Sequence, residues 1–261
     1  MQLTETRTKN AERKLWNLAA RYNKKGLGFL RKNNKTIISM DKRNECPRES
    51  TETPCAYCYK GDIYKRLGKA GFEQGKVYHC SDTFNETLLR EFCREYRKIL
   101  KQYNIDFSIR LFSMGDYMQE HKVFWCNVLT VMKEEGVKIH AVTKQYDIIG
   151  EIADLLVCIN LSVDTIHEQN SFKAAVEAKK TLELYTRVKI RCMAKDTADF
   201  EYFKNKVDII TIYHGNNLSR TMPEIETYTV KGKAYTKLVN DLDNGKVCCT
   251  KRTCTNCKRC Q

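Results

Sequence analysis

The sequence predicts an α/β fold, a partial (βα)6 barrel of the TIM type with a small cysteine-rich extension at its C-terminal end. Short β-branched segments alternate with amphipathic segments six times along the chain. The 261 residues suffice for one large domain with an appendage. Such alternation implies parallel strands joined by helical crossovers. Six repeats fall short of a closed eight-stranded barrel, and a doubly wound sheet remains an alternative because it has the same alternation.

The six expected strands are short and rich in β-branched residues, as buried parallel strands are. In chain order they cover residues 36–40, 107–112, 137–142, 155–161, 188–193 and 207–212. The connecting helices are expected at residues 86–103, 119–135, 145–154, 171–184 and 198–205. The clearest of them begins at Glu86, where apolar residues recur on one face and Thr83 with Glu86 matches a capping box.

The chain divides into three expected parts. Residues 1–35 form an N-terminal helical segment, residues 36–214 the barrel, and residues 215–261 an extension with a second cysteine cluster. The start of the sequence lacks an apolar stretch of the signal-peptide type, and no run approaches the length of a membrane-spanning helix. We therefore expect a cytoplasmic location and no membrane partner.

Cysteine and charge are the unusual features of the composition. Thirteen cysteines are many for a cytosolic chain, and in a reducing compartment clustered cysteines are metal ligands or catalytic groups more often than disulfides. The formal net charge is +14. This excess favours an anionic partner such as RNA, DNA, a nucleotide or an acidic peptide, although a lysine-rich composition alone also produces it.

Three cysteines lie in the loop after the first expected strand. Cys55 and Cys58 are separated by two residues, and Cys46 precedes them in the same loop. Two thiolates at this spacing can bind one metal or cluster, because the intervening turn points both sulfurs the same way. A structural zinc site needs four protein ligands, whereas a four-iron cluster held by three cysteines keeps one iron open to a small molecule.

This loop resembles the radical SAM superfamily, in particular its small phage-associated cysteine-rich proteins. The family signature is three cysteines after the first barrel strand with an aromatic residue just before the last, here Tyr57. Eight residues separate Cys46 from Cys55, where the family usually has three; the Elongator-type catalytic subunit also has a longer gap. The resemblance implies a 4Fe-4S cluster on Cys46, Cys55 and Cys58. It further implies an enzyme that takes one electron from a donor and cleaves S-adenosylmethionine to a 5′-deoxyadenosyl radical.

The resemblance extends to the polar residues after the next three strands, and implies that they bind S-adenosylmethionine: Gly115, Asp116, Thr143, Lys144, Ser162 and Asp164. A glycine permits close approach and a carboxylate pairs with an ammonium, so Asp116 is expected to bind the amino group. Thr143 and Lys144, after the third strand, are expected to contact the cofactor carboxylate. Ser162 and Asp164, after the fourth strand, are expected to contact its ribose or carboxylate. A helix-capping role is the alternative for Asp116, and a plain turn without a binding role is the alternative for Ser162 and Asp164.

A second cysteine group ends the chain. Three cysteines at two-residue gaps resemble the ligand run of bacterial ferredoxins, and one more cysteine can complete a closed site. The expected ligands are Cys249, Cys254, Cys257 and Cys260, with Cys248 or Cys80 as alternative fourth ligands. The group can hold a second 4Fe-4S cluster or a zinc ion.

Two other functions remain open on the sequence. One is a zinc-binding protein that binds nucleic acid without catalysis, and the other is an electron carrier. A row of cations on the helix at residues 86–103 suits a phosphate backbone, but interleaved glutamates favour a solvated face. The row consists of Arg90, Arg94, Arg97 and Lys101. Four cysteines in expected helices and strands are interpreted as buried core thiols: Cys93, Cys126, Cys158 and Cys192.

Overall fold

A computed structural model of the 261-residue chain describes residues 2–33, 37–41, 84–112, 115–163, 169–194, 197–203, 205–212 and 247–248. Its helical elements are α1 (Gln2–Lys24), α3 (Glu86–Tyr103), η2 (Gln119–His121), α4 (Lys122–Glu134), η3 (Ile149–Leu155), α5 (Gln169–Leu182) and α6 (Thr197–Phe203). The strands are β1 (Leu30–Asn33), β2 (Ile37–Met40), β3 (Ile109–Leu111), β4 (Ile139–Thr143), β5 (Cys158–Val163), β6 (Arg187–Ala194), β7 (Ile209–Ile212) and β8 (Val247–Cys248).

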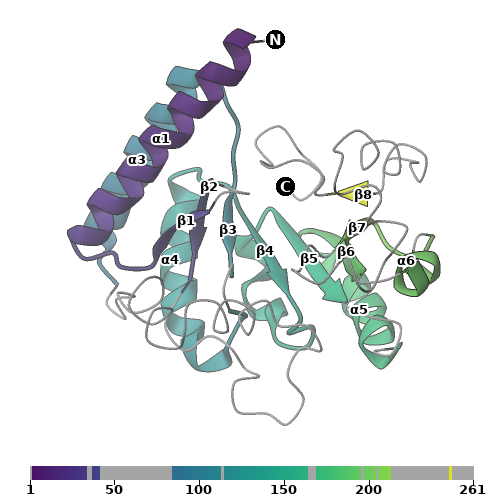
Figure 1. Ribbon diagram of the computed structural model, residues 1–261. Helices are drawn as coiled ribbons and strands as arrows, with labels where there is room; N and C mark the ends of the chain where they lie inside the picture. Colours follow the sequence, from purple (N-terminus) through teal and green to yellow (C-terminus); the bar gives the residue numbers. More distant parts are fainter. Residues whose placement is uncertain are drawn as a thin grey trace, which may run out of the picture.

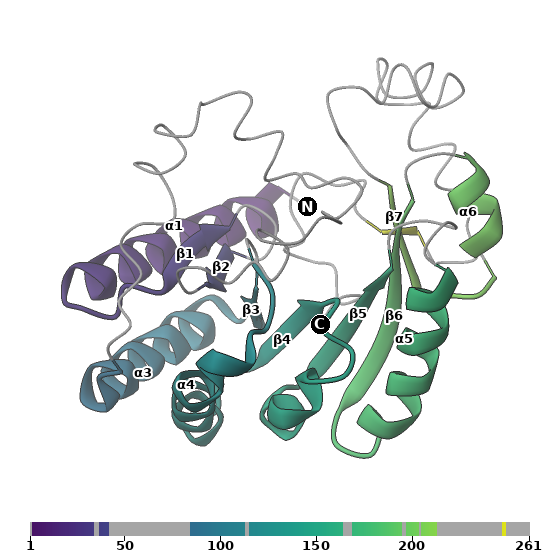
Figure 2. The ribbon, with the colours of Figure 1, turned by 90° about the horizontal axis from the view of Figure 1, so that it is seen from below.

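The strands form one sheet in the order in which they occur along the chain, from β1 to β8. β1 pairs antiparallel with β2, and every later pairing is parallel. The strands follow an arc with the helices along its outside (Figure 1, Figure 2). A doubly wound sheet reverses its strand order at one point. The consecutive order therefore excludes that alternative, whereas closure into a partial barrel stays a prediction.

The hydrophobic core lies between the outer face of the sheet and the helices. Every second residue of the parallel strands contributes to it, because successive side chains of a strand point to opposite faces. The alternating strand residues in this core are Ile38, Met40, Ile109, Leu111, Ile139, Ala141, Ile159, Leu161, Val163, Val188, Ile190, Cys192 and Ile210, and Leu30 of β1 and Ile37 of β2 also belong to it. Buried side chains of α3 and α4 face them, among them Phe92 and Trp125.

The N-terminal helix shares this core. In α1 the buried residues recur at helical spacing, at Ala11, Leu15, Leu18 and Tyr22. The Tyr22 ring meets Phe92 of α3 edge-on with 5.7 Å between ring centroids. The antiparallel strand β1, which the sequence did not predict, then returns the chain to β2.

The two long crossover helices end in residues suited to their termini. Asn85 caps α3 by accepting a hydrogen bond of 3.0 Å from the Leu88 N–H, so the expected Thr83–Glu86 capping box is wrong. At the end of α4, the Gly136 N–H donates to Lys133 O and the Val137 N–H to Met132 O, the two bonds of a Schellman motif. Gly136 has φ +68°, which glycine adopts without steric cost.

The elements follow the expected alternation closely. The helix from Glu86 to Tyr103 has its predicted ends, and the six predicted strands each overlap an observed one. The segment expected as a helix at 145–154 instead forms turns followed by the 3-10 helix η3. Among the helices of the described residues, none is both long and apolar enough to cross a membrane.

Candidate functional site at the carboxyl edge of the sheet

Asp116 connects the segments that follow two neighbouring strands. It lies in the loop after β3, and its Oδ2 accepts a hydrogen bond of 2.8 Å from the Lys144 N–H just after β4. Its Oδ1 accepts from the Thr143 hydroxyl and, at 2.8 Å, from the Tyr117 N–H. The carboxyl ends of parallel strands meet at one edge, so these residues converge there although 27 positions separate Asp116 from Thr143.

The network continues along the turn after β4. Thr143 Oγ1 accepts a hydrogen bond of 2.9 Å from the Gln145 N–H. The Tyr146 hydroxyl donates to the Ser162 carbonyl of β5 at 2.6 Å. Polar groups at the ends of β3, β4 and β5 are therefore joined into one edge, in which Ser162 is buried.

Burial controls the charge of this carboxylate. It raises the pKa of Asp116 above its ordinary value, and the hydrogen bonds from Thr143, Lys144 and Tyr117 act in the opposite direction. Asp116 does not cap a helix, which was the alternative role considered for it. The N-cap residues of the two helices that follow it are Met118 for η2 and His121 for α4. Asp116 instead fixes the turn after β4, and an ammonium group next to it would favour its charged form.

The remaining expected ligands lie outside the described residues. This holds for Cys46, Cys55, Tyr57, Cys58, Asp164, Cys249, Cys254, Cys257 and Cys260, and for the alternative ligand Cys80. Within the described ranges, no three histidine, cysteine, aspartate or glutamate side chains form a metal-binding group. The cysteine-bearing segment 42–83 begins directly after Asp41, at the carboxyl end of β2. Because β8 is parallel to β7, the chain also leaves Cys248 toward the carboxyl edge.

Of the four cysteines expected in the core, Cys93 and Cys192 belong to it and Cys126 packs against it, whereas Cys158 lies on the opposite face of β5. Cys93, Cys158 and Cys192 are buried and Cys126 is half-buried. Burial raises the pKa of Cys93 to about 12 and also raises that of Cys126, which keeps both as thiols at neutral pH. Because the thiolate is the form that binds metals, Cys93 and Cys126 are not suited to ligate a metal in this state.

The inner face of the sheet mixes polar residues with apolar ones such as Val142, Cys158 and Ile209. The strand residues that alternate with the core positions include Ser39, Arg110, His140, Asn160, Ser162, Lys189 and Arg191. Five of these are buried, namely Ser39, His140, Asn160, Ser162 and Arg191. Parallel strands that are covered on both faces normally consist of continuous apolar residues. A buried polar face on such strands is therefore a candidate ligand-binding surface.

His140 lies in the middle of this inner face. Its Nδ1 is 2.7 Å from the Ser108 Oγ, and the ring is almost fully buried. Burial lowers the pKa of His140 to about 3, and the positive charges of Arg110, Arg191 and Lys189 lower it further. The imidazole is therefore neutral at physiological pH, and it cannot serve there as an acid.

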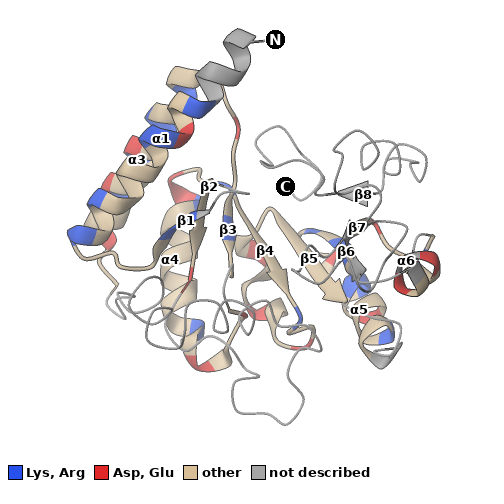
Figure 3. Cartoon of the chain, viewed as in Figure 1, with Lys and Arg blue, Asp and Glu red and all other residues tan. Residues whose placement is uncertain are grey.

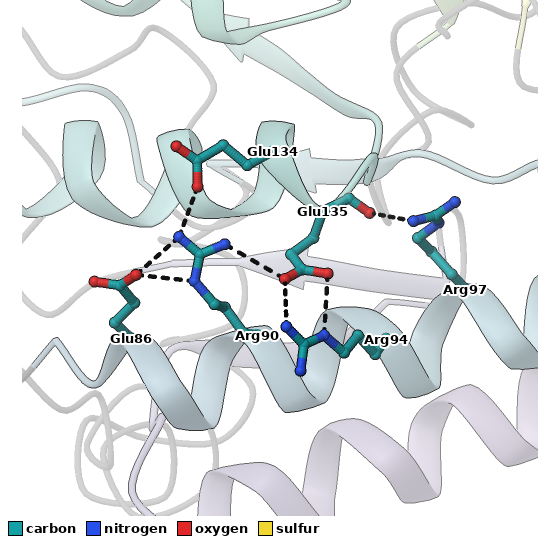
Figure 4. Close-up of polar contacts among 6 residues, drawn as sticks. All are labelled: Glu86, Arg90, Arg94, Arg97, Glu134 and Glu135. Carbon is teal, nitrogen blue, oxygen red and sulfur yellow. Dashed lines mark hydrogen bonds and ion pairs between the residues drawn. The ribbon is translucent and has the colours of Figure 1, made fainter.

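Three of the four cations in the row on α3 make contacts within the protein, namely Arg90, Arg94 and Arg97. Arg90 donates to Glu134 at 2.6 Å and to Glu86 and Glu135, and Arg94 donates to Glu135 (Figure 4). Arg97 donates to the Glu135 carbonyl at 3.0 Å. These arginines join α3 to the end of α4, and acidic residues alternate with basic ones along α3 (Figure 3). The arrangement supports the solvated-face interpretation over a track for a phosphate backbone.

Sequence reasoning missed the polar inner face. The signal was present, since a polar residue recurs at every second position of β6, at Arg187, Lys189 and Arg191. A strand that is apolar on one face only shows this alternation. β5 repeats the pattern at Asn160 and Ser162, and β3 and β4 each add one such residue, Arg110 and His140. Together these positions would have indicated a shared, largely polar surface.

The chain matches no protein-family model, no curated protein and no solved structure.

Proposed function

We propose that the chain is a radical SAM-type iron–sulfur enzyme built on a partial (βα)6 barrel. In this proposal Cys46, Cys55 and Cys58 hold a 4Fe-4S cluster, and the cysteine group at the C-terminal end holds a second cluster or zinc. The substrate is anionic, in keeping with the net charge of +14.

One observation carries the proposal. Asp116, Thr143 and Lys144 are joined by hydrogen bonds at the same sheet edge where the cysteine-bearing segment 42–83 begins. In sheets of parallel strands, ligands bind at the carboxyl ends of the strands. A small molecule bound to an open iron at this edge would lie near a carboxylate suited to its amino group.

The residues of the chain have distinct parts in the proposed reaction. A cluster held by Cys46, Cys55 and Cys58 would supply the one-electron chemistry that cleaves the sulfonium of S-adenosylmethionine, with the electron coming from an external reductant. Asp116 binds the amino group of S-adenosylmethionine. Thr143 orients the Asp116 carboxylate by donating a hydrogen bond to it. Lys144 provides a polar contact for the carboxylate of S-adenosylmethionine, and Ser162 provides one for its ribose. The helices outside the sheet support these positions through the core.

Anaerobic purification with iron and sulfide quantitation tests the metal site. We expect a triple variant, Cys46→Ala, Cys55→Ala and Cys58→Ala, to lose the iron of the first cluster and keep the metal bound near the C-terminal end. Cys126→Ala is the control, because this half-buried thiol belongs to α4 and should not bind metal. Unchanged iron content in the triple variant would contradict the proposal.

Formation of 5′-deoxyadenosine by the reduced protein tests the reaction. With dithionite and S-adenosylmethionine, the wild type should form it and the triple variant should not. Asp116→Asn should keep its iron but form product at least about tenfold more slowly, because it loses the charge that pairs with the amino group. Asp147→Asn, an exposed change in the following turn, is the matched control. Colourless protein that contains zinc and forms no product would favour the nucleic-acid-binding alternative.

A further inference from the structure

Between residues 9 and 25, the solvent-exposed side of α1 and the turn that ends it carries only positive charge. The exposed residues of this stretch are six cations, two asparagines and one alanine: Lys9, Asn10, Arg13, Lys14, Asn17, Ala20, Arg21, Lys24 and Lys25. The acidic residue of the stretch, Glu12, is buried. From Lys9 to Lys24 this side of the helix is about 22 Å long, at the rise of an α-helix.

This segregation of charge differs from the pattern on α3. A solvated helix face ordinarily mixes both signs, and α3 does so, with exposed Glu86 and Glu91 beside exposed Arg94 (Figure 3). The sequence of α1 from Arg13 to Lys24 contains no acidic residue at all. The interpretation as a plain solvated face, which fits α3, therefore does not explain α1.

The contacts of these cations within the protein are mostly with neutral groups. Lys14 Nζ donates a hydrogen bond of 3.2 Å to Gln102 Oε1 and lies 5.2 Å from the centre of the Tyr103 ring, so its charge is not neutralised there. Arg21 differs, because it forms an ion pair with Glu95 of α3. Arg21 is therefore held by the protein, whereas the charge of Lys14 remains accessible to an external anion.

The opposite side of α1 is committed to the core. Leu15, Leu18 and Tyr22 are buried, and the Tyr22 ring contacts Phe92 of α3. A helix that binds a membrane surface inserts its apolar side into the lipid. Because the apolar side of α1 already packs on the protein, its basic side suits a water-soluble polyanion better than a membrane.

The shape and composition of the basic side favour a double-stranded nucleic acid. Proteins that bind single strands stack the bases on aromatic side chains, and the exposed residues of α1 between 9 and 25 include no aromatic one. Recognition specific to RNA uses its 2′-hydroxyls or splayed bases. Duplex DNA carries one negative charge per about 1.7 Å of its axis, and a row of cations binds it without any base contact.

We propose that the exposed side of α1 binds the phosphate backbone of duplex DNA without sequence preference, through Arg13, Lys14 and Lys24. Asn17 lies on the same side and is placed to donate from its amide to a phosphate oxygen. DNA binding by α1 requires no cluster, so it goes beyond the proposed function and does not rest on it.

Fluorescence anisotropy with a labelled DNA duplex of about 20 base pairs tests this surface. The double variant Arg13→Gln, Lys24→Gln should weaken binding at least about tenfold and reduce the slope of log affinity against log salt by about two. Arg13→Lys with Lys24→Arg keeps both charges and should bind within about twofold of the wild type. The matched control is Lys173→Gln with Lys180→Gln, which removes two exposed charges from α5 and should also stay within about twofold. Glutamine is a good helix former, and circular dichroism identifies folded variants.

The outcomes identify both the surface and the partner. Unchanged binding by R13Q/K24Q, or equal weakening by K173Q/K180Q, would overturn the site on α1. Tighter binding of a single strand of the same length would contradict the choice of a duplex. Displacement of the duplex by polyglutamate of equal total charge would overturn the assignment to DNA in favour of an acidic protein.

The cysteine variant separates this surface from the proposed function. The triple variant of Cys46, Cys55 and Cys58 should bind the duplex like the wild type, because α1 does not depend on the cluster. A wild type that binds DNA through α1 but forms no 5′-deoxyadenosine would refute the enzyme proposal alone. A wild type that forms 5′-deoxyadenosine but binds no duplex would refute the DNA surface alone.

Discussion

The buried side chain of His140 makes the stability of the folded protein depend on pH. His140 is neutral in the folded protein, because burial and three neighbouring cations lower its pKa to about 3. In the unfolded chain a histidine has a pKa of about 6.5. Between these values the unfolded state binds a proton at this position that the folded state does not bind. The stabilisation from neutral His140 is therefore complete above about pH 6.5 and is lost as the pH falls toward 3.

Replacing His140 with glutamine should flatten this pH dependence. Between pH 7 and pH 5 the wild type should lose about 2 kcal/mol of unfolding free energy through this residue, and His140→Gln should not lose that amount. Urea unfolding at the two pH values measures the difference. At pH 7 the variant differs from the wild type in its contact with Ser108, and the comparison across pH removes this contribution.

His121→Gln, a histidine replacement outside the sheet, is the control and should keep the loss seen in the wild type. An H140Q variant with the same loss between pH 7 and pH 5 as the wild type would contradict a buried neutral His140.

The sequence located part of the site because strand ends can be read from a pattern. The resemblance implied functional roles for Asp116, Thr143 and Lys144, which follow expected strands, and the structure joins these residues by hydrogen bonds. Arg110 and Arg191 were not predicted, since they lie within strands. Their proximity to His140 depends on strand order and on the arc of the sheet, which no local pattern contains.

At the scale of elements, the contact between α3 and α4 combines a helix end with a row of arginines. Glu135, which follows α4, accepts hydrogen bonds from Arg90 and Arg94 through its side chain and from Arg97 through its carbonyl. Surface ion pairs individually contribute little, but several that share one acceptor restrain each other. The positive φ of Gly136 then turns the chain toward β4.

Gly136→Ala should destabilise the protein by about 1–2 kcal/mol, because a non-glycine residue at positive φ is strained. A Cβ at this position would also lie 3.4 Å from the Arg97 Cζ, against the guanidinium that binds Glu135. Chemical denaturation measures the loss. Gly150→Ala is the matched control, since its Cβ would make an ordinary 3.6 Å contact with Leu182. It should stay within about 0.5 kcal/mol of the wild type, and an equal loss in both variants would contradict the role of the turn.

The predictability of each element follows from its residues. α3 was predicted to its ends because its apolar residues keep the helical period over the full length. β1 was missed because Leu30-Arg31-Lys32-Asn33 contains no β-branched residue, and only its pairing with β2 makes it a strand. The helix predicted at residues 145–154 begins later, as η3 at Ile149. The residues before it form a turn, in which Gln145 and Tyr146 make hydrogen bonds to Thr143 and Ser162.

For the whole molecule, consecutive strand order places β4 and β5 in the middle of the sheet, with strands on both sides and helices over the outer face. Their backbone hydrogen bonds should therefore open only in large unfolding events. We expect the slowest amide hydrogen exchange at Ile139–Thr143 and Cys158–Val163. Exchange at β1, the antiparallel strand at the end of the sheet, should be at least about tenfold faster.

Hydrogen exchange followed by mass spectrometry of peptides measures this order. α1 provides an internal comparison, because it packs on α3 outside the sheet. Protection of β1 equal to that of β5 would mean that the sheet opens as a single unit.

The division of each strand into a core face and a polar face has an evolutionary consequence. Residues such as Ile159 and Leu161 pack in the core beneath the helices, while Asn160 and Ser162 between them face the opposite side of the sheet. Mutations at alternate positions are therefore subject to different selection pressures, one for stability and one for recognition. A lineage of such chains can change what it recognises by altering a few alternate residues and still inherit the same scaffold.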